Sequence, residues 1–384
     1  MKKNTLTPIT LLLTLSCFSL SAEAISLKKT YFSRVQKKSA PKKPVATAPL
    51  PTTQTTTTQT TTTPDPLLTR VFSATSPWNT PIGENPVYEP NSAAMMELVK
   101  MYVQQGGYAP VLGLNYKQWT APLHFIDSTT APKRTVYFDT AKVGYHEGFH
   151  NSVDPLGIGE VPNIPMPTSV WPDPKADGHM IMYDTATGTI YEFSRFRWDS
   201  TGKALATRVA IFESTSEGTQ VPFDGSRWWM KNVRGSGMPF IGGLIRYTEF
   251  QSGEIKHALS MAGPTNRLKK LASNTWSKEL CAPMAARTDG WEIGDNTILE
   301  GARIQLNPNL DLDSLNLSAD AKVVARALQK YGAFMADNSP TLSLYFQNLG
   351  TNSYLWEQTQ LGDLTKIPLS EFKVLKCDDI RTKQ

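Results

Sequence analysis

Most hydrophobic residues beyond position 66 lie in short runs that are typical of β-strands. These runs are rich in β-branched or aromatic side chains, and Gly, Pro, Asp or Asn bounds them. We expect strands at residues 136–138, 180–183, 189–198, 208–213, 244–250, 255–261 and 302–306. This succession predicts a mainly β fold of the sandwich or jelly-roll kind, with a few peripheral helices.

Two segments have the periodicity of amphipathic helices. Apolar side chains recur at i, i+3, i+4 and i+7 within residues 91–105, and Gly106 follows. Residues 318–331 begin at Ser318, a good N-cap, and stop before Gly332. We therefore expect a helix in each segment.

The first 24 residues have the features of a secretory signal peptide. Two lysines precede a short apolar run, and a small-x-small cleavage site ends at Ala24. Cleavage there is the favoured outcome, and lipidation at Cys17 is the alternative. The apolar run is too short to span a bilayer, so we expect no transmembrane segment. The sequence thus predicts an exported protein that is secreted, periplasmic or held at the cell surface.

Residues 25–66 have the composition of a disordered spacer, because a basic stretch and a Thr/Pro-rich tract can bury little apolar surface. The chain has a formal net charge of +5, of which residues 1–24 contribute +1 and residues 25–64 contribute +7, leaving −3 for residues 65–384. We place a single β-rich domain at residues 67–384. Its mildly acidic balance argues against nucleic acid as a partner.

The mature chain keeps two cysteines, Cys281 and Cys377. An exported protein meets an oxidising compartment, where these residues can form a disulfide. Two unpaired thiols in a core are the alternative.

The string His146-Glu147-Gly148-Phe149-His150 matches the H-E-x-x-H pattern of zinc peptidases. In that pattern two His on one helical face bind the metal and the Glu is the general base. Gly costs about 1 kcal/mol in a helix interior, and this string contains one. A zinc site at His146 and His150 therefore remains a low-ranked alternative to a chance match, and no other cofactor is indicated.

A predicted hairpin around Gly188 brings a His and a Glu together. If Ile181 opposes Glu192, strand alternation puts His179 on the same face of the sheet. Tyr183 lies on that face as well. Because a His beside a Glu can exchange protons at neutral pH, we predict His179 as the proton-transfer group and Glu192 as its partner. A solvent-facing polar row is the alternative.

A second predicted hairpin, around Gly253, places Arg246 and His257 on one face. Arg is a natural partner for a carboxylate or a developing oxyanion, so we predict that both residues stabilise charge on a substrate. The same residues could instead form a short helix that ends at Gly253. A buried His257 with satisfied hydrogen bonds is the alternative to a functional one.

Asp337 follows an apolar run at an expected strand end. It could act with Glu192 as the pair of carboxyl groups that glycoside hydrolysis needs, and an ordinary Asp-Asn turn is the alternative.

The chain has nine tryptophans, and exposed indoles stack on sugars whereas buried ones fill cores. We predict substrate binding by Trp228 and Trp229, with Asp177 and Tyr183 beside the hairpin.

Several further strings occur in order: Ser76-Pro-Trp-Asn-Thr-Pro-Ile82, Asp177-Gly-His-Met-Ile-Met-Tyr-Asp184, Tyr191-Glu-Phe193, Gly242-Gly-Leu-Ile-Arg246, His257-Ala-Leu259 and Ala327-Leu-Gln-Lys-Tyr-Gly332. Together they resemble a family of secreted bacterial proteins that is defined by this sequence pattern and implies no activity. The zinc-like string is not part of the pattern. The resemblance draws attention to the polar residues in or near these strings, namely Asp177, His179, Glu192, Arg246, His257 and Asp337.

These features lead us to expect a secreted carbohydrate-active enzyme that cleaves an extracellular polysaccharide by hydrolysis or β-elimination. The first alternative is a non-catalytic surface module that binds glycan or protein, with residues 25–66 as its stalk. The second is a zinc metallopeptidase.

Overall fold

The computed structural model describes residues 70–139, 141, 159–219, 233–270 and 276–383. The chain divides into two units, residues 1–61 and 62–384, and every described residue belongs to the second. Strand exceeds helix, 28% against 19%, which confirms the predicted mainly β class with few helices. Among the described residues, no helix has the length and hydrophobicity needed to cross a bilayer.

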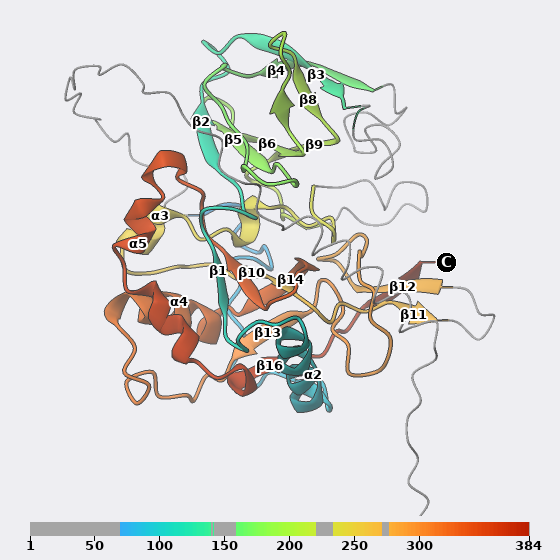
Figure 1. Cartoon of the computed structure of the whole chain (residues 1–384), viewed down its shortest axis with the longest axis vertical. Helices are drawn as coiled ribbons and strands as arrows, with labels where there is room; N and C mark the ends of the chain where they lie inside the picture. Colours follow the sequence, from blue (N-terminus) through green and yellow to red (C-terminus); the bar gives the residue numbers. More distant parts are fainter. Residues whose placement is uncertain (1–69, 140, 142–158, 220–232, 271–275, 384) are drawn as a thin grey trace, which may run out of the picture. The chain divides into compact units, whose positions relative to one another are not determined.

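The largest sheet has six strands and mixed directions (Figure 1). Its order is β1 (Gly113–Asn115), β15 (Ser343–Tyr345), β10 (Leu259–Gly263), β14 (Ala333–Asn338), β13 (Arg303–Leu306) and β16 (Phe372–Val374). β10 runs parallel to β14 and antiparallel to β15. This sheet places the end of β14 next to the loops that carry the candidate site.

Both predicted helices are present, as α2 (Ser92–Gln105) and α4 (Ala319–Lys330). The Ser318 hydroxyl accepts the Ala321 N–H at 3.2 Å, so the predicted N-cap is confirmed. Gly332 has a φ of 65°, which suits glycine at a helix end. The sequence pattern missed several short helices: α5 (Tyr354–Glu357), η2 (Ile241–Gly243), η3 (Gly350–Asn352), η4 (Leu361–Lys366) and η5 (Leu369–Glu371).

Three smaller sheets complete the described fold. One has the order β2 (Leu123–Ile126), β5 (Met180–Asp184), β6 (Thr189–Ser194) and β9 (Arg208–Glu213). The next has the order β4 (Glu160–Pro165), β3 (Lys133–Phe138), β8 (Ala204–Ala206) and β7 (Arg197–Trp198). The last contains β11 (Lys269–Lys270), β12 (Trp276–Cys281) and β17 (Ile380–Lys383).

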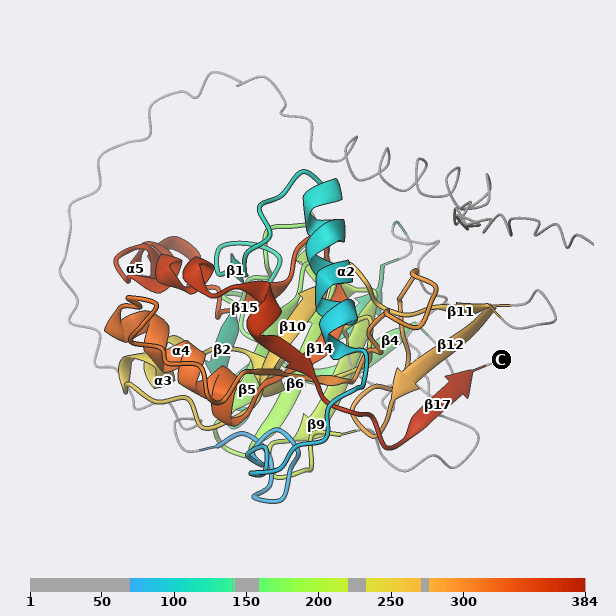
Figure 2. The ribbon, with the colours of Figure 1, turned by 90° about the horizontal axis from the view of Figure 1, so that it is seen from below.

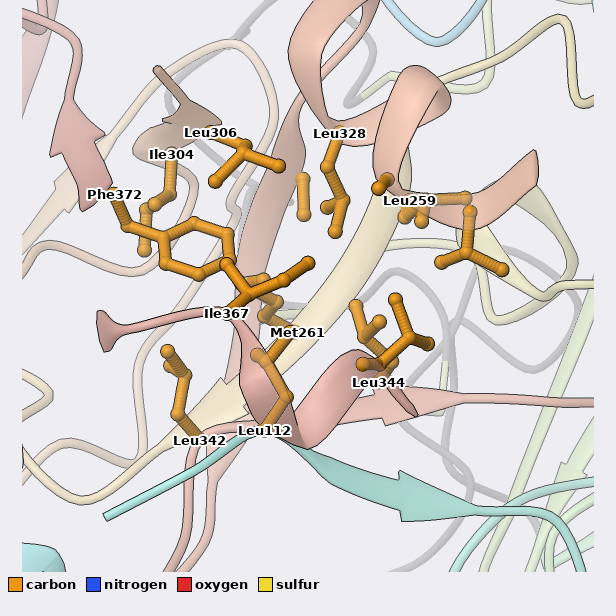
Figure 3. Packing of buried hydrophobic residues seen from close by; sticks show 14 of the residues in the cluster. Leu112, Leu259, Met261, Ile304, Leu306, Leu328, Leu342, Leu344, Ile367 and Phe372 are labelled. Carbon is orange, nitrogen blue, oxygen red and sulfur yellow. The ribbon is translucent and has the colours of Figure 1, made fainter. Parts of the chain in front are cut away.

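The buried side chains form successive layers. On β14, Ala333 and Met335 join a core that α2 and α4 cover, whereas Phe334 and Ala336 join a second core on the other face. Figure 3 shows the first of these cores, and Figure 2 shows α2 in front of β10 and β14 with β6 and β9 behind them. A third core lies between the β5–β6 sheet and the β3–β8 sheet. The packing of sheet on sheet follows from strand alternation, with apolar side chains on both faces of β5 and β14.

The segment around Gly253 differs from the predicted hairpin. Residues 247–251 form α3, and only Leu259–Gly263 is strand. The prediction of two strands is therefore wrong, and the alternative of a short helix ending near Gly253 is confirmed. Local hydrogen bonds explain the difference, because Glu249 Oε1 accepts the Arg246 N–H at 2.8 Å and so caps the helix start.

Cys281 and Cys377 form a disulfide across a sequence separation of 96 residues. The sequence left this pairing open, and the structure decides it in favour of the bridge. The bond joins the end of β12 to the segment that follows β16.

Candidate active site

A β-bulge aims the carboxyl group of Asp337 at the inter-sheet layer. Met261 pairs with Met335, but Ala262 pairs with Asp337, so β14 holds one extra residue at this point. Without that residue, alternation would turn Asp337 toward the helix-covered core. Bulges commonly re-aim side chains next to active sites. Asp337 therefore lies in a strand, and the alternative of an ordinary turn is wrong.

Three groups contact the Asp337 carboxyl. Its Oδ1 accepts the Gly235 N–H at 2.6 Å, and its Oδ2 accepts the Tyr345 hydroxyl at 3.3 Å. The Nη1 of Arg234 lies 3.6 Å from Oδ2. Burial raises the pKa of Asp337 to about 7, with Arg234 opposing the rise and Asp289 adding to it. The side chain is still 17% exposed, so this carboxyl can exchange a proton with a bound molecule near neutral pH.

Arg234 is a buried cation held between two aromatic rings. Its guanidinium carbon lies 3.8 Å from the ring centroid of Phe240 and 4.4 Å from that of Tyr345. Its Nη2 donates to the Phe240 carbonyl at 3.2 Å. Within the described part of the chain, Nε and Nη1 have no hydrogen-bond partner. Such a desolvated charge acts strongly on neighbouring carboxyl groups.

Asp289 lies against the same glycine that Asp337 contacts. A Cβ added to Gly235 would meet the Asp289 carboxyl carbon at 2.5 Å, so this close approach requires glycine. Because Asp337 accepts the N–H of that residue, the two carboxyl groups lie within about 8 Å of each other. Asn338 Nδ2 donates to Asp289 Oδ1 at 2.8 Å, while the Asp289 side chain remains exposed.

A buried Glu supports Asp289 from inside. Burial raises the pKa of Glu300 well above its usual range, and its side-chain hydrogen bond with Asp289 adds to this. Its Oε2 accepts the Asp289 N–H at 3.3 Å. Asn266 Nδ2 donates to Glu300 Oε1 at 2.9 Å. These contacts hold a buried acid next to Asp289.

Arg287 fixes the backbone of the Arg234–Gly235 turn. Its Nε donates to the Arg234 carbonyl at 3.1 Å and to the Gly235 carbonyl at 3.0 Å. Burial lowers the pKa of Arg287 to about 10, and the carboxyls of Asp289 and Asp337 oppose that shift. Two guanidinium groups thus face this group of acids, and they offset the repulsion between the carboxyls.

The predicted hairpin of β5 and β6 is confirmed in register. Ile181 pairs with Glu192, as the position of Gly188 predicted. His179 and Glu192 both contact Phe240: the His179 ring lies 4.9 Å from the Phe240 ring, and Glu192 Oε1 accepts the Phe240 N–H at 2.8 Å. The structure therefore brings these two predicted residues to one place, next to Arg234.

The pKa values of these two side chains shift in opposite directions. Burial lowers the pKa of His179 to about 4, with Asp177 opposing the shift, so its imidazole is neutral at neutral pH. Burial raises the pKa of Glu192 to about 7, although hydrogen bonds from Phe240 and Ile241 oppose this. Glu192 is fully buried and accepts both backbone N–H groups, which makes it an anchor for the segment that starts at Phe240.

The remaining predicted site residues do not all lie at the candidate site. The charge of Asp177 acts on His179 and Asp337, which places it at the candidate site. Tyr183 is partly buried near the other end of β5, where its ring lies 5.9 Å from that of Phe125. Trp228, Trp229, His146 and His150 lie outside the described residues. Within the described ranges, no group of three or more His, Cys, Asp or Glu side chains could hold a metal ion.

Arg246 and His257 meet, but around a residue that the sequence reading did not single out. Arg246 Nη2 lies 2.5 Å from Glu249 Oε2, and His257 Nε2 lies 3.1 Å from both Glu249 oxygens. Burial alone would raise the pKa of Glu249, but Arg246 and His257 outweigh it and bring the value to about 2. All three side chains are buried. Their contacts stabilise the start of α3, and their role in charge stabilisation stays a prediction.

A separate open cleft of about 810 Å³ lies along α4 and includes Ile82, Glu254, Gln305 and Arg326. None of the predicted site residues lines it.

Sequence reasoning missed the residues that hold the site together, namely Arg234, Tyr345, Asp289, Glu300 and Arg287. They come from loops and strand ends that are far apart in the chain, so no periodicity marks them. The nearest signal was the pair of glycines Gly235 and Gly237, which indicates a tight backbone approach. No protein-family model matches the chain, and no curated protein or solved structure matches it either.

Proposed function

We propose that this protein hydrolyses glycosidic bonds in an extracellular polysaccharide, with Asp337 as the general acid and Asp289 as the second carboxylate. One observation carries the proposal: two carboxyl groups in different environments contact the same residue, Gly235. Glycosidases use two carboxyl groups that flank the scissile bond, usually about 5 to 9.5 Å apart. The separation of at most about 8 Å does not exceed the upper end of this range.

The two environments suit two different roles. Asp337 has a pKa of about 7, so much of it carries a proton at neutral pH, as a general acid must. Asp289 is exposed and receives a hydrogen bond from Asn338, which suits a base or nucleophile. Asp337 would protonate the glycosidic oxygen as the bond to the anomeric carbon breaks. Water would add to that carbon, directly or after attack by Asp289, and its proton would return to the carboxyl pair.

β-Elimination is the second candidate, and Arg234 favours it. Its Nε and Nη1 have no hydrogen-bond partner in the described part of the chain. A uronate bound beside Asp337 would lie near this buried positive charge, which would make the C–H next to its carboxylate more acidic. Asp337 or Tyr345 could take that proton and pass it to the leaving glycosidic oxygen. This route releases an unsaturated sugar instead of consuming water.

Export of the protein is part of the proposal. The Cys281–Cys377 bridge fits an oxidising compartment. The N-terminal features of a signal peptide and the resemblance to secreted bacterial proteins support the same location.

The test is a panel of neutral, acidic and amino polysaccharides incubated with the full chain. New reducing ends without ultraviolet absorbance indicate hydrolysis, and absorbance from unsaturated sugars indicates elimination. Asp337→Asn and Asp289→Asn should each lower the rate of cleavage by about 10² or more. Asp313→Asn is the matched control, because Asp313 is 80% exposed and pairs with Lys322 of α4. Polymer binding without cleavage by the wild type would instead favour a surface binding module.

A further inference from the structure

Trp119 has a backbone conformation that a bulky side chain rarely adopts. Its φ is 60°, in the left-handed region, where the Cβ atom comes too close to the following carbonyl oxygen. Burial does not account for this conformation, because the side chain is 43% exposed. Phe72, the other aromatic residue with a positive φ among those described, is buried. Within the described part of the chain, the Trp119 indole makes no hydrogen bond, ring contact or cation–π contact.

A buried carboxylate holds Trp119 in this conformation. Asp173 Oδ1 accepts the Trp119 N–H at 3.2 Å, and its Oδ2 accepts the Thr120 N–H at 3.3 Å. The same carboxylate accepts the Lys175 N–H at 2.9 Å and Asn348 Nδ2 at 3.3 Å. Strained residues persist only where their surroundings fix them, and they concentrate at active sites and ligand-binding sites. The fixed and exposed indole is therefore a candidate for contact with a ligand.

The Trp119 loop is hydrogen-bonded to two segments that lead into the candidate active site. The Asp173 N–H donates to the His179 carbonyl at 2.8 Å. Thr120 donates its hydroxyl to the carbonyl of the residue that follows Tyr345, at 2.7 Å. The contacts of Asp173 with both residues place the Cα atoms of Trp119 and His179 within about 15 Å of each other. A polysaccharide of several sugar units can extend from the candidate active site to this loop.

We propose that Trp119 is a sugar-stacking position, which binds a pyranose ring of the polysaccharide away from the bond that is cleaved. The inference rests on the proposed function and adds a substrate contact outside the pair of carboxyl groups. An indole covers the apolar face of a sugar ring. Gln118, the preceding residue, is exposed, and its amide can form hydrogen bonds with the sugar hydroxyls. Single exposed hydrophobic residues are ordinary on protein surfaces, so the left-handed backbone that Asp173 maintains is what sets Trp119 apart.

Binding is measured separately from cleavage. Affinity electrophoresis of the Asp337→Asn chain, through gels that contain each polysaccharide of the panel, gives an apparent Kd while cleavage is slow. Adding Trp119→Ala or Trp119→Gly should raise the apparent Kd about tenfold, and Trp119→Tyr should restore part of the affinity. Asn316→Gly is the matched control, because Asn316 is also exposed and has a φ of 49°. It should leave the apparent Kd unchanged.

The melting temperature tests the backbone strain. Trp119→Gly should melt about 1 to 3 °C above Trp119→Ala, because glycine adopts a φ of 60° without a clash whereas alanine does not. Both variants lack the indole, so the comparison isolates the backbone. A chain that is more stable with glycine and yet binds the polymer less tightly would show that the strain is kept for contact with the ligand.

The outcomes separate this proposal from the proposed function. Cleavage by the wild type, together with unchanged binding after Trp119→Ala, would overturn the stacking position and leave the hydrolase. Binding that depends on Trp119, without any cleavage by the wild type, would leave the stacking position and overturn the hydrolase. If the chain binds no polysaccharide, both proposals are wrong. An equal loss of binding for Asn316→Gly, or equal melting temperatures for Trp119→Gly and Trp119→Ala, would also overturn the role given to Trp119.

Discussion

Asp337 and Asp289 share Gly235: Asp337 accepts its backbone N–H at 2.6 Å, and the Asp289 carboxyl occupies the space where a side chain would begin. One residue thus fixes two carboxyl groups that come from β14 and from the loop between β12 and β13. Repulsion between them is offset by Arg234, 3.6 Å from Asp337, and by Arg287. The site therefore depends on the contact between segments that are far apart in the sequence.

Asp337→Asn should lower turnover by about 10² to 10⁴ and leave the fold intact, because general acid catalysis contributes that much. The amide oxygen can still accept the Gly235 N–H, so the loop position is kept. Initial rates on the cleaved polysaccharide and thermal unfolding provide the two measurements. If the variant keeps more than about a tenth of the wild-type activity, Asp337 is not the general acid.

Gly235→Ala should lower activity while costing little stability. The new methyl group would force the Asp289 carboxyl aside, and that carboxyl is the end of an exposed side chain that can move. Gly83→Ala is the matched control, because no atom lies within 4 Å of its added Cβ. The measurements are the initial rate and the melting temperature of both variants, each compared with the wild type. Normal turnover by Gly235→Ala would show that the position of Asp289 is unimportant.

The rate should fall as pH rises through about 7. Asp337 must hold its proton to act as an acid, and its pKa is about 7. Arg234 lowers the pKa of Asp337, so Arg234→Gln should raise the pH at which the rate falls. Arg326→Gln on α4 serves as the control. The measurement is kcat/KM between pH 5 and pH 9. If kcat/KM falls at the same pH in Arg234→Gln as in the wild type, the role given to Arg234 is contradicted.

The hairpin at Gly188 could be predicted because its information is local. A glycine turn and alternating strands fix which residues pair, and Ile181 opposes Glu192 as expected. A strand was the favoured prediction for residues 247–251, but they form a helix. A short run of polar and aromatic residues fits a strand or a helix equally well. The choice depended on Glu249, which caps its own helix and holds Arg246 and His257.

The centre of the site could not be predicted in the same way. Arg234, Asp289 and Asp337 belong to three segments, and their approach depends on a bulge, a glycine and the stacking of two sheets. Each of these features is tertiary. The sequence did identify Asp337, because an acid at a strand end is visible without knowing what it faces. It also identified Asp177, because this residue lies beside the predicted hairpin.

The disulfide should contribute about 4 to 5 kcal/mol to the free energy of unfolding, because it closes a loop with a sequence separation of 96 residues. Cys281→Ser combined with Cys377→Ser should therefore unfold at a markedly lower denaturant concentration. The wild type in the presence of a reductant should shift equally. A change below about 1 kcal/mol would mean that the bridge does not restrict the unfolded chain.

Glu192 offers the sharpest contrast between the sequence prediction and the structure. It was predicted as a partner in proton transfer, yet it is fully buried and accepts the N–H groups of Phe240 and Ile241. Glu192→Gln keeps an oxygen that can accept both groups, so we expect folding and most of the activity to survive. Glu192→Ala leaves two buried donors unpaired and should cost about 2 to 6 kcal/mol. Loss of turnover in a folded Glu192→Gln variant would restore the catalytic role.

The same residue should also make stability depend on pH. Burial raises its pKa from 4.5 to about 7 in the folded state, so its stabilising contribution is fully present below about 4.5 and is lost as pH rises toward 7. The loss amounts to about 3 kcal/mol. Urea unfolding at pH 5 and pH 8 should therefore differ less for Glu192→Gln than for the wild type. Glu213→Gln, an exposed change on β9, should keep the wild-type difference. Identical pH dependence in all three proteins would show that Glu192 keeps an ordinary pKa in the folded chain.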